Sequence, residues 1–497
     1  METNTKTETR QDRRWLGLFA VLTAMILNLL DSTVVNVAAP AIRADLGGSE
    51  ASLQWTAAGY TLALAAGLLT GGRLGDMFGR RRMMLLGVVG FLLASFACAA
   101  AFSPGTLIAA RVLQGLFGAV MIPQAFGLIR DLFPPREIGK AFGALGPVIG
   151  LSTILGPVVA GTLIDADVLG TGWRMVFLIN LPLGAFALLA GRAALPAAPP
   201  APGQRLDLPG SLLAGAGMFL LVHPLVQGHE LGWPVWLAAE PAVSLVLLAV
   251  FVLRQRRRGR AGETPLVELA VFARRSYTSG VLFVIVFFGS IVGFSLTTGL
   301  FLQLGLAYSP MRASLAMSAW AVGAFLGSGF AAGMMARLGR RILHLGLAVM
   351  AAGLGAVHLV LGGAGTGVDG WDLALPLLGY GLGMGMIFVP LFDIIMGEIR
   401  DHEVGSASGL LESLQQMGAS LGVAVLGTVF FSVAGGGAPG VAGFVDASRT
   451  VTLISLALTV IAFALAFLLP RRARQAAAVS PQPAASGAPA EREPALV

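Results

Sequence analysis

Two carboxylates of this chain lie inside apolar stretches, where a charge requires a physical reason. Asp31 lies in LLDSTVVNVAAP, residues 29–40, within an apolar run that begins at Trp15. Glu412 lies in SGLLESLQQMGASLG, residues 408–422, about two helical turns into another such run. Burial favours the protonated form of a carboxyl group, and a nearby positive charge favours the ionised form. Movement between two such settings would bind and release a proton, so proton transfer is the chemistry that these acids predict.

The composition places these stretches in a membrane. The 497 residues are 56% hydrophobic and 12% charged, whereas a soluble protein carries about 25% charged residues. The net charge of +7 does not indicate a nucleic-acid-binding protein, because the basic residues are spread between apolar runs instead of gathering in one soluble region. The single cysteine, Cys98, excludes an intramolecular disulfide.

Fourteen stretches are long enough to cross the membrane as helices, at about 20 apolar residues each. Charge clusters and Gly/Pro turns separate them. The first is expected to stay as an uncleaved helix, because its apolar run is too long for a signal peptide. The predicted spans are 15–38, 53–72, 83–102, 106–129, 141–164, 175–191, 209–227, 235–253, 277–301, 312–335, 342–362, 373–396, 405–433 and 450–470.

The distribution of Lys and Arg sets the predicted orientation, since these residues concentrate on the cytoplasmic side. With the N-terminus inside, the cytoplasmic segments hold 28 basic residues and the outer loops hold 4. Both termini are therefore predicted to be cytoplasmic. The basic excess then faces the anionic inner leaflet.

One further basic residue, Arg111, lies within a span. Asp31 lies roughly 24 Å along its helix from Trp15, and Arg111 is five residues into a helix that enters from the other side, so both reach a similar depth. Each charge alone would cost about 3 kcal/mol to insert. We therefore expect the two to pair or to share a polar cavity. The pair either is a static ion pair that holds two helices together or includes a carboxylate that titrates during transport. Glu412 has two interpretations of its own. It either reaches water at a helix end or forms a proton or cation site.

A short internal repeat divides the chain into two halves. GGRLGDMFGRRR, residues 71–82, closes the second span, and AGMMARLGRR, residues 332–341, closes the tenth. Repeated bundles around a central site are common in secondary transporters. We expect an all-α membrane protein whose fourteen helices form two pseudo-symmetric bundles of six with two helices between them. Its predicted parts are a cytoplasmic tail 1–14, an N-terminal bundle 15–191, two inserted helices 209–253, a C-terminal bundle 277–470 and a disordered cytoplasmic tail 471–497.

Several motifs resemble one family. LDSTVVNVAAP, GRLGDMFGRRR, RVLQGLFGAVMIP (111–123) and WRMVFLINLP (173–182) are similar to motifs of the fourteen-helix drug:proton antiporters of the major facilitator superfamily. The resemblance covers residues 10–472. Its fifth-helix exporter motif is represented by Gly143, Gly156, Pro157 and Gly161, with Ser152 and Ala160 where the family usually has glycine. These small residues either serve export or only allow close helix packing.

The resemblance implies roles for individual residues. Asp31, Arg111 and Glu412 would couple proton movement to transport. A conformational latch in the cytoplasmic loop would pair Asp76 with a basic group such as Arg130 in the outward-open state. The residues assigned to this latch are Gly72, Asp76, Gly79, Arg80 and Arg130. The second copy has Ala336 where Asp76 aligns, so the latch would be one-sided.

Polar residues within the spans are candidates for a substrate pocket. Each is either a contact for the transported compound or an ordinary hydrogen bond between helices. The candidates are Asn28, Asn36, Tyr60, Gln114, Gln124 and Gln416. The family's acid in the tenth helix is absent from SLAMSAWAVGAFLGSG, residues 314–329, which argues against dicationic substrates.

Taken together, these features predict proton-coupled export of hydrophobic, cationic or amphipathic drugs across a bacterial cytoplasmic membrane by alternating access. The alternatives are a dedicated exporter of one self-made metabolite or antibiotic, a proton-driven nutrient importer, and a membrane sensor. No metal-ligand cluster, nucleotide-binding motif or catalytic triad stands out, so we expect no enzyme activity, metal, cofactor or nucleic-acid partner. Protons, lipid and lipophilic small molecules are the expected partners of a functional monomer.

Overall fold

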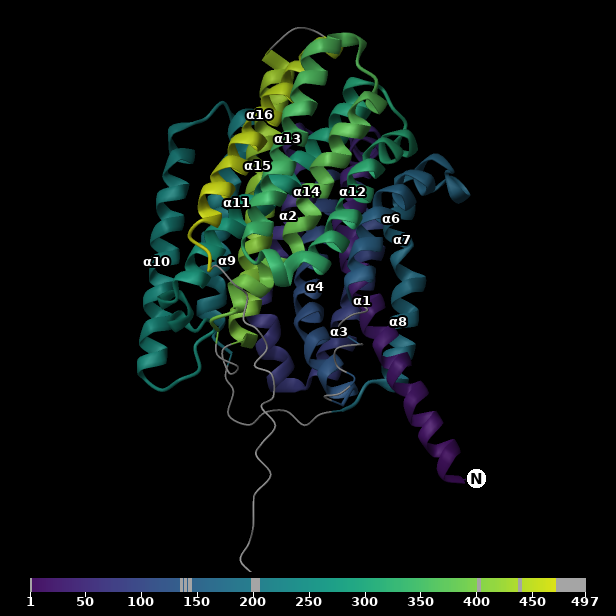
Figure 1. The fold of residues 1–497 in the computed structure, drawn as a ribbon, viewed down its shortest axis with the longest axis vertical. Coiled ribbons are helices and arrows are strands. Elements are labelled where there is room, and N and C mark those ends of the chain that lie inside the picture. Colours follow the sequence, from purple (N-terminus) through teal and green to yellow (C-terminus); the bar gives the residue numbers. More distant parts are fainter. Residues whose placement is uncertain are drawn as a thin grey trace, which may run out of the picture.

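A computed structural model describes residues 2–134, 137, 141, 145–197, 206–399, 404–436 and 440–470. All regular secondary structure in these residues is helical, and the long helices run side by side along the longest axis of the molecule (Figure 1). The predicted all-α fold class is confirmed. The predicted tail 471–497 and Gly143 of the exporter motif lie outside the described residues.

The helices fall into three consecutive groups. The N-terminal bundle comprises α1 (Glu2–Leu46), α2 (Glu50–Phe78), α3 (Arg80–Ala99), α4 (Pro104–Leu132), α6 (Leu145–Asp165), α7 (Met175–Leu178) and α8 (Asn180–Ala194). The inserted hairpin comprises α9 (Leu208–Leu231) and α10 (Ala239–Arg260). The C-terminal bundle comprises α11 (Arg275–Leu300), continued by a π-helical turn at Phe301–Gly305, with α12 (Pro310–Leu338), α13 (Arg341–Ala364), α14 (Ala374–Met396), α15 (Val404–Gly436) and α16 (Val441–Ala466).

Short polar and glycine signals set the helix ends. The side chain of Ser49 caps α2, and Ser103 forms a capping box at the start of α4. The repeated motif ends a helix at a glycine of positive φ in both bundles: Gly79 ends α2 with φ of 93°, and Gly339 ends α12 with φ of 50°. Because side chains other than glycine rarely adopt such φ values, glycine is required at both turns.

Twelve helices of the described part are long and apolar enough to cross a membrane. The protein is therefore a multi-pass membrane protein. Helices α2 and α6 are not among the twelve, and the number of fourteen spans stays a prediction. Most of α2 is buried inside the protein, so its surroundings tolerate the Gln, Thr and Gly residues that lower its hydropathy.

The two bundles repeat one packing pattern. Helix α2 crosses α4 in the N-terminal bundle, and α12 crosses α14 in the C-terminal bundle. Glycine allows close approach in both crossings: a Cβ atom at Gly71 would lie 1.9 Å from the carbonyl oxygen of Ala119, and one at Gly385 would lie 2.0 Å from that of Ala324. Packing of this kind is typical of helices in lipid, where small residues bring the backbones together.

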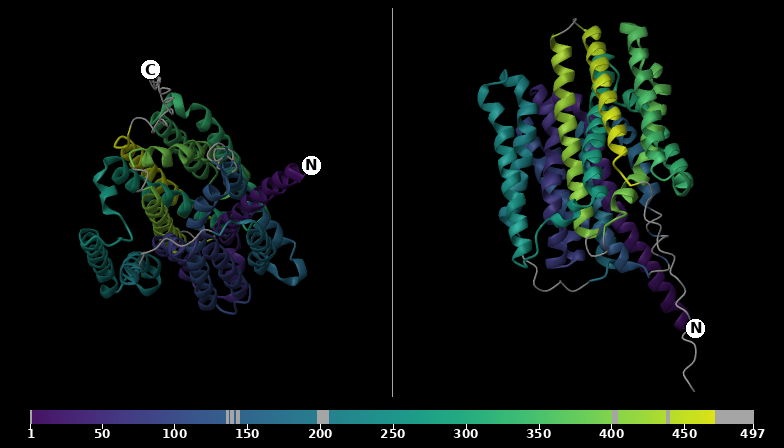
Figure 2. Two further views of the ribbon diagram at one scale, coloured as in Figure 1. Left: turned by 90° about the horizontal axis from the view of Figure 1, so that it is seen from below. Right: turned by 60° about the vertical axis from the view of Figure 1, so that its left-hand side comes forward.

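The bundles meet along two pairs of helices. Helix α2 packs on α15, and α6 packs on α12. Helix α9 packs against both α2 and α15, whereas α10 packs on α9 and lies at the edge of the assembly (Figures 1 and 2). We call the end where α1 begins the arginine-rich end, because Arg80, Arg81, Arg82 and the arginines of 254–260 lie there. The other end is called the opposite end.

Candidate functional site

Asp31 and Arg111 form an ion pair inside the N-terminal bundle. Helices α1 and α4 bring an Nη1 of Arg111 onto an Oδ2 of Asp31, and the two side chains are 0% and 1% exposed. The similar depth inferred from the sequence is therefore matched by direct contact. The pair has no access to solvent in this conformation.

Three further side chains complete what we call the Asp31 cluster: Asp31, Ser95, Arg111, Gln114 and Asn180. Gln114 Nε2 donates to Asp31 Oδ1 over 2.8 Å, and Asn180 Nδ2 donates to the same oxygen over 3.0 Å. Both amides also donate to Ser95 Oγ, at 2.8 and 3.2 Å. Arg111 Nη1 donates to Gln114 Oε1 over 2.7 Å. The carboxylate is thus held by donors from α4 and α8 in addition to its counterion.

Aromatic rings and main-chain groups enclose Arg111. Its Nε donates to the carbonyl oxygen of Thr56 over 3.1 Å, and its guanidinium carbon lies 4.1 Å from the ring centre of Tyr60 and 5.8 Å from that of Phe177. Asn28 Nδ2 donates to the Tyr60 hydroxyl over 2.5 Å. A buried ion pair with all of its hydrogen bonds made is stable as a unit, but loss of one partner leaves an uncompensated charge.

Two members of the cluster, Ser95 and Asn180, were not predicted. Asn180 lies in the apolar run of 175–191, and a lone amide there is a usable signal, like that of the predicted glutamines. Ser95 gives no such signal, because serine in a membrane helix commonly bonds to its own backbone. Only the packing of α3 against α4 and α8 reveals its role.

Glu412 lies on α15 in the other bundle. Its side chain is partly buried, and Gln416 Nε2 donates to its Oε1 over 3.2 Å. No basic side chain of the described part pairs with it. Neighbouring serines join α15 to α2: Ser413 Oγ donates to the carbonyl oxygen of Ala65 over 2.6 Å, and Ser420 Oγ lies 2.6 Å from Thr61 Oγ1. Glu412 is thus a carboxyl group beside the contact between the bundles.

The predicted pocket residues fall into two sets. Asn28, Tyr60 and Gln114 belong to the surroundings of the Asp31 cluster, and Gln416 bonds to Glu412. Gln124 Nε2 donates to the carbonyl oxygens of Gly71, over 2.8 Å, and of Val120, over 2.9 Å, so its amide closes the α2–α4 crossing. Asn36 differs from all of these, because its side chain makes no hydrogen bond to any described residue and its Oδ1 is buried.

The predicted latch residues gather at the arginine-rich end. Asp76 Oδ1 lies 3.7 Å from an Nη of Arg80, which also lies 3.5 Å from Asp131. Gly72 faces Pro123 of α4, since a Cβ atom there would lie 3.8 Å from the proline ring. Arg130 is exposed and, among the described residues, makes no bond to Asp76. This arrangement does not test the pairing expected for an outward-open state.

The described part of the exporter motif packs against both bundles. A Cβ atom at Gly156 would lie 2.4 Å from Thr33 Oγ1 of α1, and one at Gly161 would lie 2.7 Å from the Cα of Met311 in α12. Pro157 follows Gly156 inside α6, where its missing N–H permits a bend. At the end of α6, the carboxylate of Asp165 accepts from Ser309 Oγ over 2.7 Å and from Met311 N over 3.2 Å.

Hydrogen bonds between the bundles lie in the middle and at the opposite end of the described structure. Those at the opposite end include the Asp165 contacts with α12 and the Gln54–Thr428 contact of 3.4 Å between α2 and α15. Gln303 Nε2, in the π-helical turn, donates to the carbonyl oxygen of Val37 in α1 over 3.1 Å. These contacts join the two bundles at their middle and at the opposite end.

The inserted hairpin contains a further ionisable pair. His223 Nδ1 of α9 lies 2.8 Å from Glu240 Oε2 of α10. The His223 ring also lies 6.0 Å from Trp55 of α2, centre to centre. Glu230 accepts from the main-chain nitrogen of Ala51 over 2.7 Å, which ties α9 to the first turn of α2.

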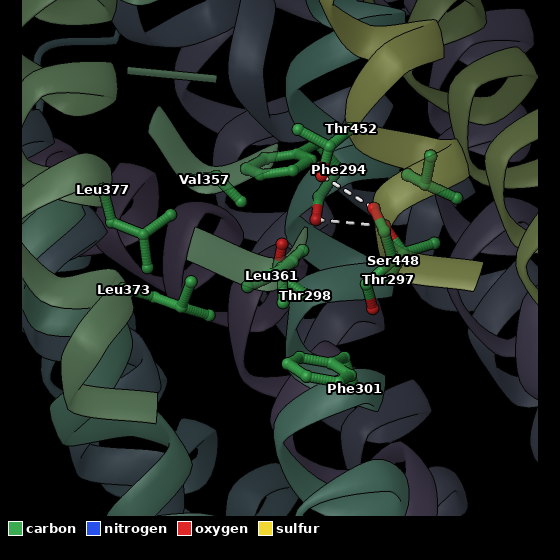
Figure 3. A pocket seen from close by; sticks show the side chains of 11 residues that line it. Phe294, Thr297, Thr298, Phe301, Val357, Leu361, Leu373, Leu377, Ser448 and Thr452 are labelled. Carbon is green, nitrogen blue, oxygen red and sulfur yellow. Dashed lines mark hydrogen bonds between the residues drawn. The ribbon is translucent and has the colours of Figure 1, made fainter. Parts of the chain in front are cut away.

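A cavity inside the C-terminal bundle is too small for a drug-sized compound (Figure 3). Hydroxyl groups of Thr297, Thr298, Ser448 and Thr452 line it together with apolar side chains. Its volume is about 10 Å³, which is room for roughly one water molecule, whereas ligand pockets measure about 300–1,000 Å³. The Ser448 hydroxyl has no partner in the described part, and a single water would satisfy it.

Curated proteins of similar sequence are transport and resistance proteins. A probable actinorhodin transporter of Streptomyces coelicolor is 46% identical over 424 residues, which cover 85% of this chain and 73% of that protein. A puromycin resistance protein of Streptomyces alboniger is 37% identical, covering 84% and 82%. A tetracenomycin C resistance and export protein of Streptomyces glaucescens is 35% identical, covering 85% and 77%.

Solved structures and a family model agree on the fold. A D-xylose–proton symporter superposes with a TM-score of 0.64 at 17% identity, covering 92% of this chain and 97% of that one. A bacterial homologue of the human lysosomal transporter Spinster gives a TM-score of 0.62, also at 17% identity, covering 91% and 95%. The family model for the Major Facilitator Superfamily matches residues 21–423. The resemblance noted in the sequence motifs is thereby confirmed, and the chain belongs to the major facilitator superfamily of membrane transporters.

Proposed function

We propose that this transporter exports lipophilic small molecules from a bacterial cytoplasm in exchange for protons, by alternating access. The observation that carries the proposal is the fully buried Asp31–Arg111 pair. Charged residues inside a membrane are costly and rare, and those that are present usually serve function. The export direction is supported by the names of the similar resistance and export proteins. The proton gradient supplies the energy, and no cofactor takes part.

Proton binding at Asp31 would rearrange the cluster. Protonation removes the carboxylate charge, so the hydrogen bonds from Gln114 and Asn180 weaken and Arg111 loses its counterion. Arg111 then keeps the Thr56 carbonyl, the Gln114 amide oxygen and the rings of Tyr60 and Phe177 as partners among the described residues. Helix α1 carries Asp31 and also contacts α6 and α11. A shift of α1 on protonation would therefore reach the contact between the bundles.

The arginine-rich end faces the cytoplasm in this proposal, in keeping with the positive-inside rule. The contacts of Asp165 and Gln303 then close the outer side. Opening to the outside would break them and bring Asp76 to its predicted latch partner Arg130. Its pairing with Arg80 here belongs to the outward-closed state of this scheme.

Substrate-driven proton release tests the proposal directly. Purified protein is placed in proteoliposomes containing a pH-sensitive dye, and a panel of lipophilic antibiotics is added. Asp31→Asn should abolish the proton signal. Asp446→Asn, the same change at an exposed carboxylate of α16, should leave it intact. Full proton coupling in the Asp31→Asn protein would overturn the role of this carboxylate.

A dedicated exporter of one metabolite is the second candidate. It is favoured by the relative at 46% identity, whose name gives a single compound. A growth-inhibition panel in an efflux-deficient host separates the two, because a multidrug exporter protects against several unrelated compounds. A dedicated exporter protects against one compound and its close analogues.

A further inference from the structure

We propose that Asn36 is the hydrogen-bonding contact for the exported compound and selects molecules that carry a hydroxyl or N–H group on an apolar body. This inference rests on the proposed export function and adds the class of substrate. It assigns two tasks to α1, at positions five residues apart: proton binding at Asp31 and substrate recognition at Asn36.

Asn36 differs from the other polar residues predicted for the pocket in having no hydrogen-bond partner among the described residues. Five of the six polar residues predicted for the pocket already have hydrogen-bond partners in the protein, namely Asn28, Tyr60, Gln114, Gln124 and Gln416. Their amides and hydroxyl would have to break these bonds to bind a ligand. In the part of the chain that the structure describes, the Asn36 side chain has no hydrogen bond to break, and its Oδ1 is buried.

An unpartnered amide in this location is costly. Inside a bilayer no bulk water is present to satisfy a polar group, so polar groups there normally bond to the protein. The neighbouring polar residues of α1 follow this rule: Ser32 Oγ and Thr33 Oγ1 both donate to carbonyl oxygens of their own helix, at 2.8 Å to Leu29 and at 2.9 Å to Leu30. The free amide of Asn36 is the exception on this segment, which is what a ligand contact requires.

Asn36 also lies where the bundles meet. A Cβ atom at Gly299 of α11 would lie 3.9 Å from the Asn36 carbonyl oxygen and 3.8 Å from the sulfur of Met317 in α12. The next residue, Val37, accepts from Gln303 in the π-helical turn, and such turns occur frequently at functional sites. The surroundings are thus residues of both bundles, and a compound bound here would bridge the parts that move relative to each other.

The chemistry of the position favours hydrogen-bond donors. Pro40 stands four residues after Asn36 inside α1 and has no N–H to give to the Asn36 carbonyl. The main-chain oxygen of Asn36 therefore lacks its usual helical donor, and Oδ1 has no partner among the described residues. Asp31, five residues earlier, is 0% exposed with its oxygens already bonded, so a substrate cation cannot reach it in this state. A hydroxyl or N–H group matches the acceptors that remain.

Matched pairs of compounds test this selection. Hydroxynaphthoquinone, hydroxyanthraquinone and hydroxycoumarin are compared with their O-methyl ethers, which lack the donor but keep the apolar body. Efflux of each is measured in an efflux-deficient host that produces the wild-type protein, Asn36→Ala, Asn36→Leu or the control Ser32→Ala. The wild-type protein should export the hydroxyl members about tenfold better, the value of roughly one hydrogen bond.

In both Asn36 variants this ratio should fall to about one while export of the ethers persists, which also shows that the variants fold. Ser32→Ala should keep the wild-type ratio. Export by the wild-type protein without preference for hydroxyl, or an unchanged ratio in both Asn36 variants, would overturn the inference and leave the proposed function standing. Failure of the wild-type protein to export any compound and to release protons on their addition would instead overturn the proposed function, and the inference with it.

Discussion

The N-terminal and C-terminal bundles cross their helices alike but have different chemistry at their centres. In the N-terminal bundle the centre holds an ion pair with amide and hydroxyl partners, the Asp31 cluster. In the C-terminal bundle an aromatic cluster lies between α11, α12 and α14: the ring centres of Trp320 and Tyr380 are 4.8 Å apart, and those of Phe294 and Tyr380 are 5.1 Å apart. The C-terminal bundle keeps its own carboxyl group, Glu412, beside the bundle contact without a basic partner in the described part.

This difference shows how a repeated scaffold can divide two tasks. Close packing through glycine needs only small residues and is the same in both halves. Under the proposed function, the proton site is in the N-terminal bundle, where a buried carboxylate lies beside its counterion. Under the proposed function, the C-terminal bundle contributes apolar and aromatic surface and one further acid.

The largest expected effect comes from removing the cation of the buried pair. Arg111→Leu leaves Asp31 buried without a counterion and should lower the free energy of unfolding by about 3–5 kcal/mol. The melting temperature of the purified protein in detergent measures this loss. The double variant Asp31→Asn/Arg111→Leu should recover most of it without restoring proton coupling. If Glu412→Gln destabilises the protein as strongly as Arg111→Leu, the contrast between the two bundles is wrong.

The second prediction concerns the acid of the C-terminal bundle. If Glu412 carries a second proton, one net charge moves for each monovalent cation exported, and the membrane potential adds about 2.3 kcal/mol per 100 mV. This is more than a tenfold change in the attainable gradient. Glu412→Gln should therefore keep transport of monovalent cations in proteoliposomes but lose its response to an imposed potential. An unchanged voltage response would reduce Glu412 to a structural residue of α15.

Two buried tyrosines provide a matched comparison. The Tyr60 hydroxyl accepts from Asn28, whereas the Tyr380 hydroxyl has no partner in the described part; both side chains are buried. Tyr60→Phe should lower the free energy of unfolding by about 1–2 kcal/mol, because Asn28 is left unpaired. Tyr380→Phe should be neutral or stabilising. Thermal unfolding of the two variants measures both changes in the free energy of unfolding. Equal decreases would mean that the Tyr380 hydroxyl in the C-terminal bundle also depends on a polar partner.

The smallest effect is expected at the repeated motif that ends α2 in one bundle and α12 in the other. Asp76 is one-third exposed in its pair with Arg80, and exposed ion pairs contribute about 1 kcal/mol or less. Asp76→Asn should therefore slow transport about fivefold while substrate affinity is kept, because Asp76 lies at the arginine-rich end and the proposed substrate contact, Asn36, lies far along α1 from that end. Arg337→Gln in the matching loop serves as the control and should leave the rate unchanged. A normal transport rate in Asp76→Asn would remove the latch from the proposal.

Features that depend on the order of residues along the chain could be predicted without the structure. Apolar length and basic clusters predicted helices at each of the positions where the structure has them, although α1 continues to Leu46, past Pro40, and α2 begins at Glu50 and ends at Phe78. The repeated turn at Gly79 and Gly339 was visible as a motif. The similar depth of Asp31 and Arg111 also followed from the sequence, because helix rise converts residue number into height in the membrane, and it left open whether the two pair or share a cavity.

Which side chains lie beside each other at one height became known from the packing of the helices. Ser95 and Asn180 join Asp31, His223 meets Glu240, and Asn36 stays unpaired. Helix rise fixes the depth of a residue, but its direction around the helix and the identity of the neighbouring helix depend on packing between small residues far apart in the sequence. From the sequence, a polar residue in an apolar run therefore indicates that an interaction exists. The partner in that interaction becomes known only when the helices are packed together.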